Sequence, residues 1–143
     1  SKSFSMKYLS FDEAMCFAYG RTMLFGGCSI ALVSEGGETK YYIPNKGFVV
    51  GGVVPEKSIG MDNEAAFKQM YNRFHFQAQM ELNENGSAVM GMWVEDGKIV
   101  FDLCNLYDKV ESFKVPLEIA AKRKERAIYD LETEREIFVN TGA

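Results

Sequence analysis

Residues 62–107, DNEAAFKQMYNRFHFQAQMELNENGSAVMGMWVEDGKIVFDLCNLY, contain the clearest structural pattern in the chain. Asp62 is a suitable helix N-cap, and apolar residues then recur at helical spacing up to the Asn-Gly stop signal at residues 85–86. Residues 87–94 and 98–107 have strand patterns and flank an Asp-Gly turn, which is among the strongest short signals for a hairpin. This stretch therefore predicts a helix followed by an antiparallel hairpin.

The same order of helix and hairpin occurs on both sides of that stretch, in units covering residues 10–54 and 112–139. Ser10 and Glu13 form a capping box in the first unit, because the serine hydroxyl can accept from the third amide of the helix while the glutamate reaches back to the cap. In the last unit Pro116 suits the first turn of a helix. Two interpretations stay open: the units are duplicated, or they share only capping chemistry.

Each unit is too small to bury its own apolar face, so the hairpins should join edge to edge with the helices packed against them. A length of 143 residues is within the usual size of one domain. We therefore predict a single α+β domain over residues 1–143, with a mainly antiparallel sheet of about six or seven strands. The other expected elements are a first helix ending at 26–27, strands over 28–34, 39–43 and 48–54, a third helix starting at Ser112, and strands over 127–131 and 136–139.

The composition excludes several classes of protein. With 47% apolar and 25% charged residues, the chain is neither disordered, collagen-like nor a coiled coil. No run of apolar residues approaches the length that a membrane helix needs, and the first residues lack the layout of a secretory signal. We expect a cytoplasmic protein that does not bind membranes.

The charges argue against a nucleic-acid partner. Sixteen basic and twenty acidic residues leave a net charge of −4, whereas phosphate binding normally requires a basic stripe. The only candidate stripe is Lys122, Arg123, Lys124 and Arg126, and it is interleaved with Glu118 and Glu125. On a helix this pattern is typical of a solvated face, so no nucleic-acid partner is expected.

No cofactor or metal site is expected either. Cys16, Cys28 and Cys104 include no close pair, which excludes a disulfide framework and a metal knuckle. His75 is the only histidine, lies at the boundary of the apolar helix face and has no nucleophile signature beside it. We interpret it as a structural residue, and we assign no catalytic residue.

A glycine-rich segment resembles a phosphate-binding loop only superficially. Gly51 and the residues up to Ser58 differ from the pattern G-x-x-x-x-G-K-[ST] at Glu56, where a carboxylate replaces the glycine that lets amides face phosphate. The glycines are expected instead to allow a bend at a strand edge. Among the acidic residues, Asp102 and Asp108 come nearest to a functional pair, but acids on strands and turns usually lie in water.

The second helix carries more apolar residues than one buried face needs. Phe76 and Met80 lie opposite its main apolar stripe and are flanked by Arg73. Phe17 and Leu24 show the same trait on the first helix. Three explanations are open: these helices are covered inside the monomer, their helical phase differs from the one assumed, or a second chain contacts them. We predict a non-catalytic protein acting through protein–protein contacts as a homodimer, with Phe76, Met80 and Arg73 at the contact.

Two alternatives remain for the function, and the biological process is not indicated. The first is a small-ligand binder with an apolar pocket, in which Tyr71, His75 and Trp93, with Arg73, supply the polar groups. The second is an accessory protein that inhibits a host enzyme, for which no particular residue argues.

Overall fold

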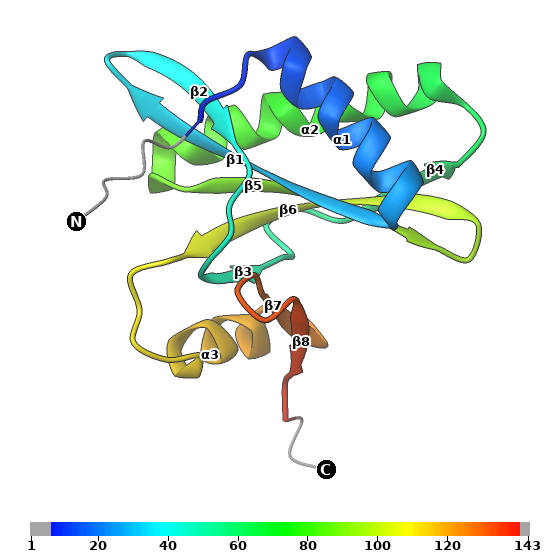
Figure 1. Cartoon of the computed structure of the whole chain (residues 1–143). Helices are drawn as coiled ribbons and strands as arrows, with labels where there is room; N and C mark the ends of the chain where they lie inside the picture. Colours follow the sequence, from blue (N-terminus) through cyan, green and yellow to red (C-terminus); the bar gives the residue numbers. More distant parts are fainter. Residues whose placement is uncertain (1–6, 141–143) are drawn as a thin grey trace.

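The computed structural model describes residues 7–140 and contains three helices and eight strands (Figure 1). In chain order they are α1 (Phe11–Phe25), β1 (Gly27–Glu35), β2 (Glu38–Tyr42), β3 (Phe48–Val50), β4 (Lys57–Gly60), α2 (Glu64–Asn85), β5 (Ala88–Glu95), β6 (Lys98–Tyr107), α3 (Lys114–Lys122), β7 (Ala127–Asp130) and β8 (Arg135–Phe138). The sheet order is β2-β1-β5-β6-β3-β7-β8, and β4 also pairs with β6. Every pairing is antiparallel, so the predicted α+β class with an antiparallel sheet is confirmed.

The strand count exceeds the prediction because the segment after residue 47 forms two short strands. The strand expected over residues 48–54 ends at Val50, and residues 57–60 form β4, which had not been predicted. Both strands pair with the long strand β6, β4 through residues 98–101 and β3 through residues 105–107. The sequence of β4 is short and polar, so its strand character comes from the edge that β6 offers rather than from its own pattern.

The start and end of α1 are those that the sequence predicts. Ser10 Oγ accepts from the Glu13 amide at 3.1 Å, and Glu13 Oε1 accepts from the Ser10 amide at 2.9 Å, which completes the capping box. At the other end Gly26 takes a left-handed conformation with φ 89° and donates its amide hydrogen to Thr22 O.

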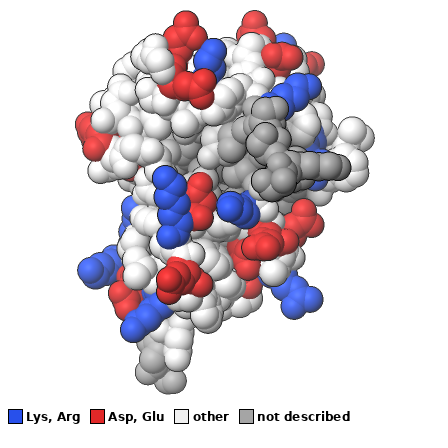
Figure 2. Space-filling model, turned by 60° about the vertical axis from the view of Figure 1, so that its left-hand side comes forward, with Lys and Arg blue, Asp and Glu red and all other residues white. Residues whose placement is uncertain are grey.

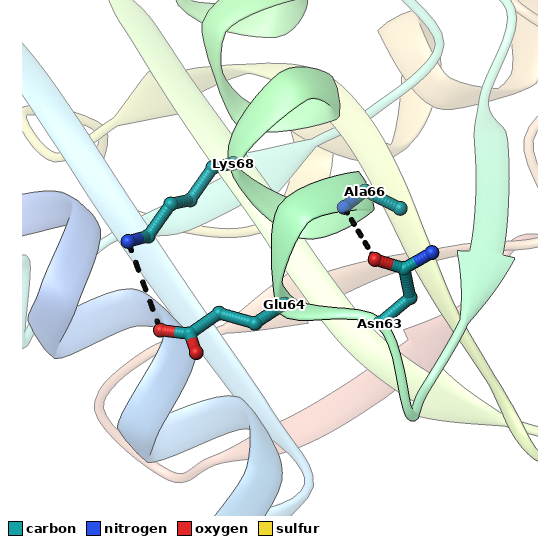
Figure 3. A network of polar contacts seen from close by, with 4 residues as sticks. All are labelled: Asn63, Glu64, Ala66 and Lys68. Carbon is teal, nitrogen blue, oxygen red and sulfur yellow. Dashed lines mark hydrogen bonds and ion pairs between the residues drawn. The ribbon is translucent and has the colours of Figure 1, made fainter.

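The start of α2 lies one residue later than predicted. Its N-cap is Asn63 rather than Asp62, and Asn63 Oδ1 accepts from the Ala66 amide at 2.9 Å (Figure 3). Glu64 and Lys68, one turn apart on the exposed side, form an ion pair at 3.8 Å. Asp62 and Asn63 both suit an N-cap, so the sequence alone does not separate them.

The start of α3 also lies one residue later than predicted. Its N-cap is Phe113 rather than Ser112, and Phe113 makes no side-chain capping bond. Ser112 Oγ accepts only from the Lys114 amide, two residues on. This contact is a local turn and not a helix cap, so the helix starts later.

The two longer helices lie on the same face of the sheet (Figure 1). Edge-to-face ring contacts join them, Phe11 with Tyr71 at 5.8 Å and Tyr19 with Phe67 at 5.0 Å between ring centroids. Beneath them the main core contains the inward residues of β1, β5 and β6, among them Ile30, Met90 and Leu103.

The last part of the chain, with α3, β7 and β8, lies on the opposite side of the sheet from α1 and α2 (Figure 1). Val49 of β3 packs against Ala31, Val89 and Cys104, which alternate with the residues of the main core. Val50, the next residue of β3, points the other way and joins the small core beneath α3. Strand β3 therefore connects two cores, and α3 packs on β3 and on β7.

No helix among residues 7–140 is long and apolar enough to cross a membrane.

Candidate functional site

The outer face of α2 carries the three residues that the sequence predicts for a contact. The Phe76 side chain is 69% exposed, Met80 is 49% exposed, and Arg73 is also exposed. The buried face of the helix consists of Phe67, Tyr71, Phe74, Ala78 and Leu82. The helical phase expected from the apolar stripe is thus the observed one, and Phe76 and Met80 are outside the monomer core.

Two opposite charges flank these apolar residues. At about 100° per residue, Arg73, Phe76, Met80 and Glu84 fall within a sector of about 80° on the helix. Arg73 and Glu84 are exposed, and neither forms an ion pair within the described part of the chain. We call these four residues the α2 face.

A second apolar surface lies at the end of α1. Phe17, Leu24 and Phe25 are exposed there, and the Arg21 guanidinium lies over the Phe25 ring at 5.1 Å and near the Phe17 ring at 6.0 Å. Strand β1, which follows α1, pairs with β5 from residue 27 but with β2 only from Ala31 onward. The first residues of β1, next to this surface, are therefore paired with β5 and not with β2. Sequence reasoning identified Phe17 and Leu24 and missed Phe25 and Arg21, which lie one helical turn apart.

The residues of the alternative ligand pocket are only partly brought together. Tyr71 is fully buried and its hydroxyl has no hydrogen-bond partner among residues 7–140, while the half-buried His75 contacts the Tyr41 hydroxyl through Nε2 at 2.5 Å. Burial lowers the pKa of His75, which favours the neutral ring. Trp93 follows Met92, which faces the helices, so Trp93 lies on the opposite face of the sheet.

A polar network joins α3, β6 and α2. Arg123, the C-cap of α3, donates through Nη1 to Val50 O and Gly51 O at 3.2 and 3.1 Å, and through Nη2 to Asn105 Oδ1 at 2.6 Å. Asn105 Nδ2 in turn donates to Glu81 Oε2 at 2.8 Å. The expectation that Arg123 belongs to a solvated basic face is wrong, because the residue is half-buried and fastens α3 to the sheet.

Charges on the rest of the surface are mixed. On the face shown in Figure 2, Lys and Arg side chains are interspersed with Asp and Glu. The described residues, 7–140, contain no group of three or more His, Cys, Asp or Glu side chains placed to hold a metal ion. All three cysteines are free thiols, and Cys16 is exposed although its sequence neighbours are apolar.

Two carboxylates approach the glycine-rich segment. A Cβ atom on Gly51 would overlap the Asp102 carboxylate and lie 2.9 Å from Glu125 Oε1, so both groups face the same point. Asp102 Oδ1 also accepts from the Gly52 amide at 3.2 Å. The two glycines therefore make room for carboxylates, and Gly52 also has a left-handed φ of 81° just after the end of β3.

Asp102 is 6% exposed, so the expectation that it lies in water is wrong. Burial, with a smaller contribution from the charges of Glu125 and Glu56, raises the pKa of Asp102 to about 7. Burial and the Glu56 charge also raise the pKa of Glu125, while Arg123 opposes that shift. Asp102 is therefore a buried carboxylate beside a half-buried one, and both have raised pKa values.

Sequence reasoning missed Glu81, Asn105 and Arg123 because they are far apart in the chain and match no motif. One signal was available. Asp102 and Asn105 are polar residues inside β6, whose other residues from Ile99 to Leu106 are apolar. A polar side chain in such a strand is buried only with a partner, so both positions indicate a polar network.

Comparison with known proteins gives no relative: no family model, no curated protein and no solved structure matches the chain.

Proposed function

We propose that this protein acts through protein–protein contacts and forms a homodimer through the α2 face, without catalysis of its own. The observation that carries the proposal is the exposure of Phe76 and Met80, one helical turn apart on the outer side of α2. Aromatic residues, Met and Arg are enriched in the cores of protein interfaces, and these three types occur together here.

The α2 face is complementary to itself. In an antiparallel pair of α2 helices about a two-fold axis, Phe76 of one copy lies opposite Met80 of the other. The same axis places Arg73 opposite Glu84. Along the helix, the midpoint between Arg73 and Glu84 lies less than one residue from the midpoint between Phe76 and Met80, so one axis relates both pairs. Each copy thus presents a cation where the other presents an anion, which favours a second copy as the occupant of this surface.

The apolar contribution is large enough to matter. Burying one Phe or Met side chain contributes about 1.5–3 kcal/mol, and the dimer would bury two of each. Loss of translational and rotational freedom opposes association, so neighbouring residues must also take part in the interface.

The cytoplasm is the proposed compartment. Support comes from the free state of Cys16, Cys28 and Cys104, which a reducing environment maintains. Fractionation of cells that produce the protein tests this assignment, and recovery in a secreted fraction would contradict it.

The description of the fold as three helix–hairpin units also remains a proposal. In its favour, each helix is followed along the chain by two strands that pair with each other, namely β1-β2, β5-β6 and β7-β8. If the units are modular, a chain truncated after residue 109 keeps α1 and α2 folded while it loses α3. Unfolding of that truncated chain would contradict modularity.

The dimer is tested by native mass spectrometry and sedimentation equilibrium on the intact chain. Phe76→Asp should weaken association at least thirtyfold, corresponding to about 2 kcal/mol, while circular dichroism stays unchanged because Phe76 lies outside the core. Leu24→Asp, on the exposed surface of α1, is the matched control and should leave the dimer intact. A monomeric wild-type protein, or a dimer broken only by Leu24→Asp, would refute the assignment of the α2 face.

A further inference from the structure

A polar cleft lies beside Asn105, where the end of α2, the end of β6 and the C-cap of α3 meet. Its volume is about 400 Å³, which is within the range of small-molecule sites. The residues that matter for recognition are Glu81, Asn85, Ser87, Asn105, Tyr107 and Arg123. None of them belongs to the α2 face.

One buried amide holds two opposite charges in this cleft. Asn105 is 5% exposed; its Oδ1 accepts from Arg123 Nη2 at 2.6 Å and its Nδ2 donates to Glu81 Oε2 at 2.8 Å. Asn85 Nδ2 donates to the same glutamate oxygen at 2.9 Å. Arg123 and Glu81 do not form an ion pair with each other, so the amide positions a cation and an anion on either side of it.

Both charged groups keep bonding capacity that the protein does not use. Within residues 7–140, Arg123 Nε and Glu81 Oε1 have no hydrogen-bond partner. Both atoms are accessible to solvent. Among the described residues, only Thr22 and Tyr71 have a buried side-chain atom without a hydrogen-bond partner. The cleft therefore presents a guanidinium donor and a carboxylate acceptor to solvent.

We propose that this cleft binds a small zwitterion of the α-amino acid class, with the ligand carboxylate on Arg123 and the ligand ammonium on Glu81. Charge-assisted hydrogen bonds of both kinds are the strong ones, and the cleft supplies one partner for each. A simple anion is repelled by Glu81 and a simple cation by Arg123, so a ligand with both charges is preferred to either alone.

The test is a titration of the ¹⁵N-labelled protein followed by NMR, with glycine, L-serine and L-leucine as probes. Saturable shifts of the Ser87, Leu106 and Arg123 backbone amides are expected at millimolar concentrations. Acetate and methylammonium each carry one of the two charges and should bind at least tenfold more weakly, since each forms only half of the charged contacts. No saturable shift with any of the three amino acids, or equal binding of acetate, would overturn the proposal.

Glu81→Gln separates charge from structure. The glutamine keeps a side-chain oxygen that can accept from Asn105 and Asn85, but it removes the negative charge. Amino-acid binding should fall at least tenfold while acetate binding strengthens, because the repulsion of anions is lost.

Glu118→Gln, on the exposed side of α3, is the control and should change neither the binding of amino acids nor the binding of acetate. Unchanged discrimination between the amino acids and acetate in Glu81→Gln would refute the role of Glu81. Retained amino-acid binding in Phe76→Asp would show that the cleft acts independently of the dimer.

Discussion

The carboxylates of Asp102 and Glu125 face the same point above Gly51, although they come from β6 and from the segment after α3. The protein thus places the buried Asp102 beside the half-buried Glu125, with the pKa of Asp102 at about 7. Such a pair costs stability when both groups are ionised and much less when they share a proton.

Stability should therefore depend on pH in a defined direction. The pKa of Asp102 is about 7 in the folded protein and about 4 in the unfolded chain, so the folded state binds the extra proton between these values. The contribution of Asp102 to the free energy of unfolding is therefore greatest below about pH 4. It falls by a few kcal/mol as the pH rises to 7. Urea unfolding at several pH values measures this dependence.

Asp102→Asn is the matched variant, because its amide oxygen can still accept from the Gly52 amide while the titration is removed. The variant should be more stable than the wild type at pH 8 and show a flatter pH dependence between pH 5 and 7. An unchanged slope in Asp102→Asn would assign the pH dependence to other groups.

Gly51→Ala should be destabilising by about 1–3 kcal/mol, because the new methyl group would overlap the Asp102 carboxylate. Gly20→Ala is the control, since it lies inside α1 with no atom within 4 Å of the added methyl group. That change should stabilise the protein by about 0.5–1 kcal/mol through helix propensity. Thermal unfolding of both variants measures the difference, and equal effects would mean that the carboxylates move aside without cost.

Tyr71→Phe should stabilise the protein by about 1 kcal/mol, because the Tyr71 hydroxyl is buried without a hydrogen-bond partner in the described part of the chain. Tyr41→Phe should have the opposite sign and a similar size, since the Tyr41 hydroxyl is bonded to His75. Urea unfolding of the two variants measures both values. A destabilised Tyr71→Phe would indicate a partner for that hydroxyl, such as an internal water molecule.

A charge reversal tests the register of the proposed dimer. Arg73→Glu should weaken association about tenfold, because it places two negative charges opposite each other at two symmetric positions. The double variant Arg73→Glu with Glu84→Arg should restore the dimer, since the pairing is re-formed with its signs exchanged. Sedimentation equilibrium at low salt measures the three proteins. Failure of the double variant to recover would exclude the antiparallel arrangement of α2.

Local elements of this protein could be predicted from the sequence. The Ser10–Glu13 capping box, the helix stop at Gly26 and the hairpin of β5 and β6 all depend on residues within a few positions of one another. The position of Phe76 and Met80 opposite the buried stripe followed from the same kind of information, because helical spacing sets the direction of every side chain. Whether they are exposed was left open by the sequence, and the structure shows that they are.

The polar network could not be predicted in this way. Arg123 contacts the carbonyl of Val50 across 73 positions in the chain, and Asp102 meets the Gly52 amide across 50. These contacts depend on β3 pairing with β6 and on α3 packing over β3, which no local pattern specifies. The polar residues within β6 indicate that partners exist without indicating which ones.

The sequence by itself determined where the helices and hairpins form, because capping, turn chemistry and apolar periodicity act between neighbouring residues. Only the tertiary structure decided that Asp102 is enclosed beside Glu125 and that Arg123 and Glu81 share the Asn105 amide. The physical reason is that burial and the fields of distant charges exist only after the strands have taken their order in the sheet.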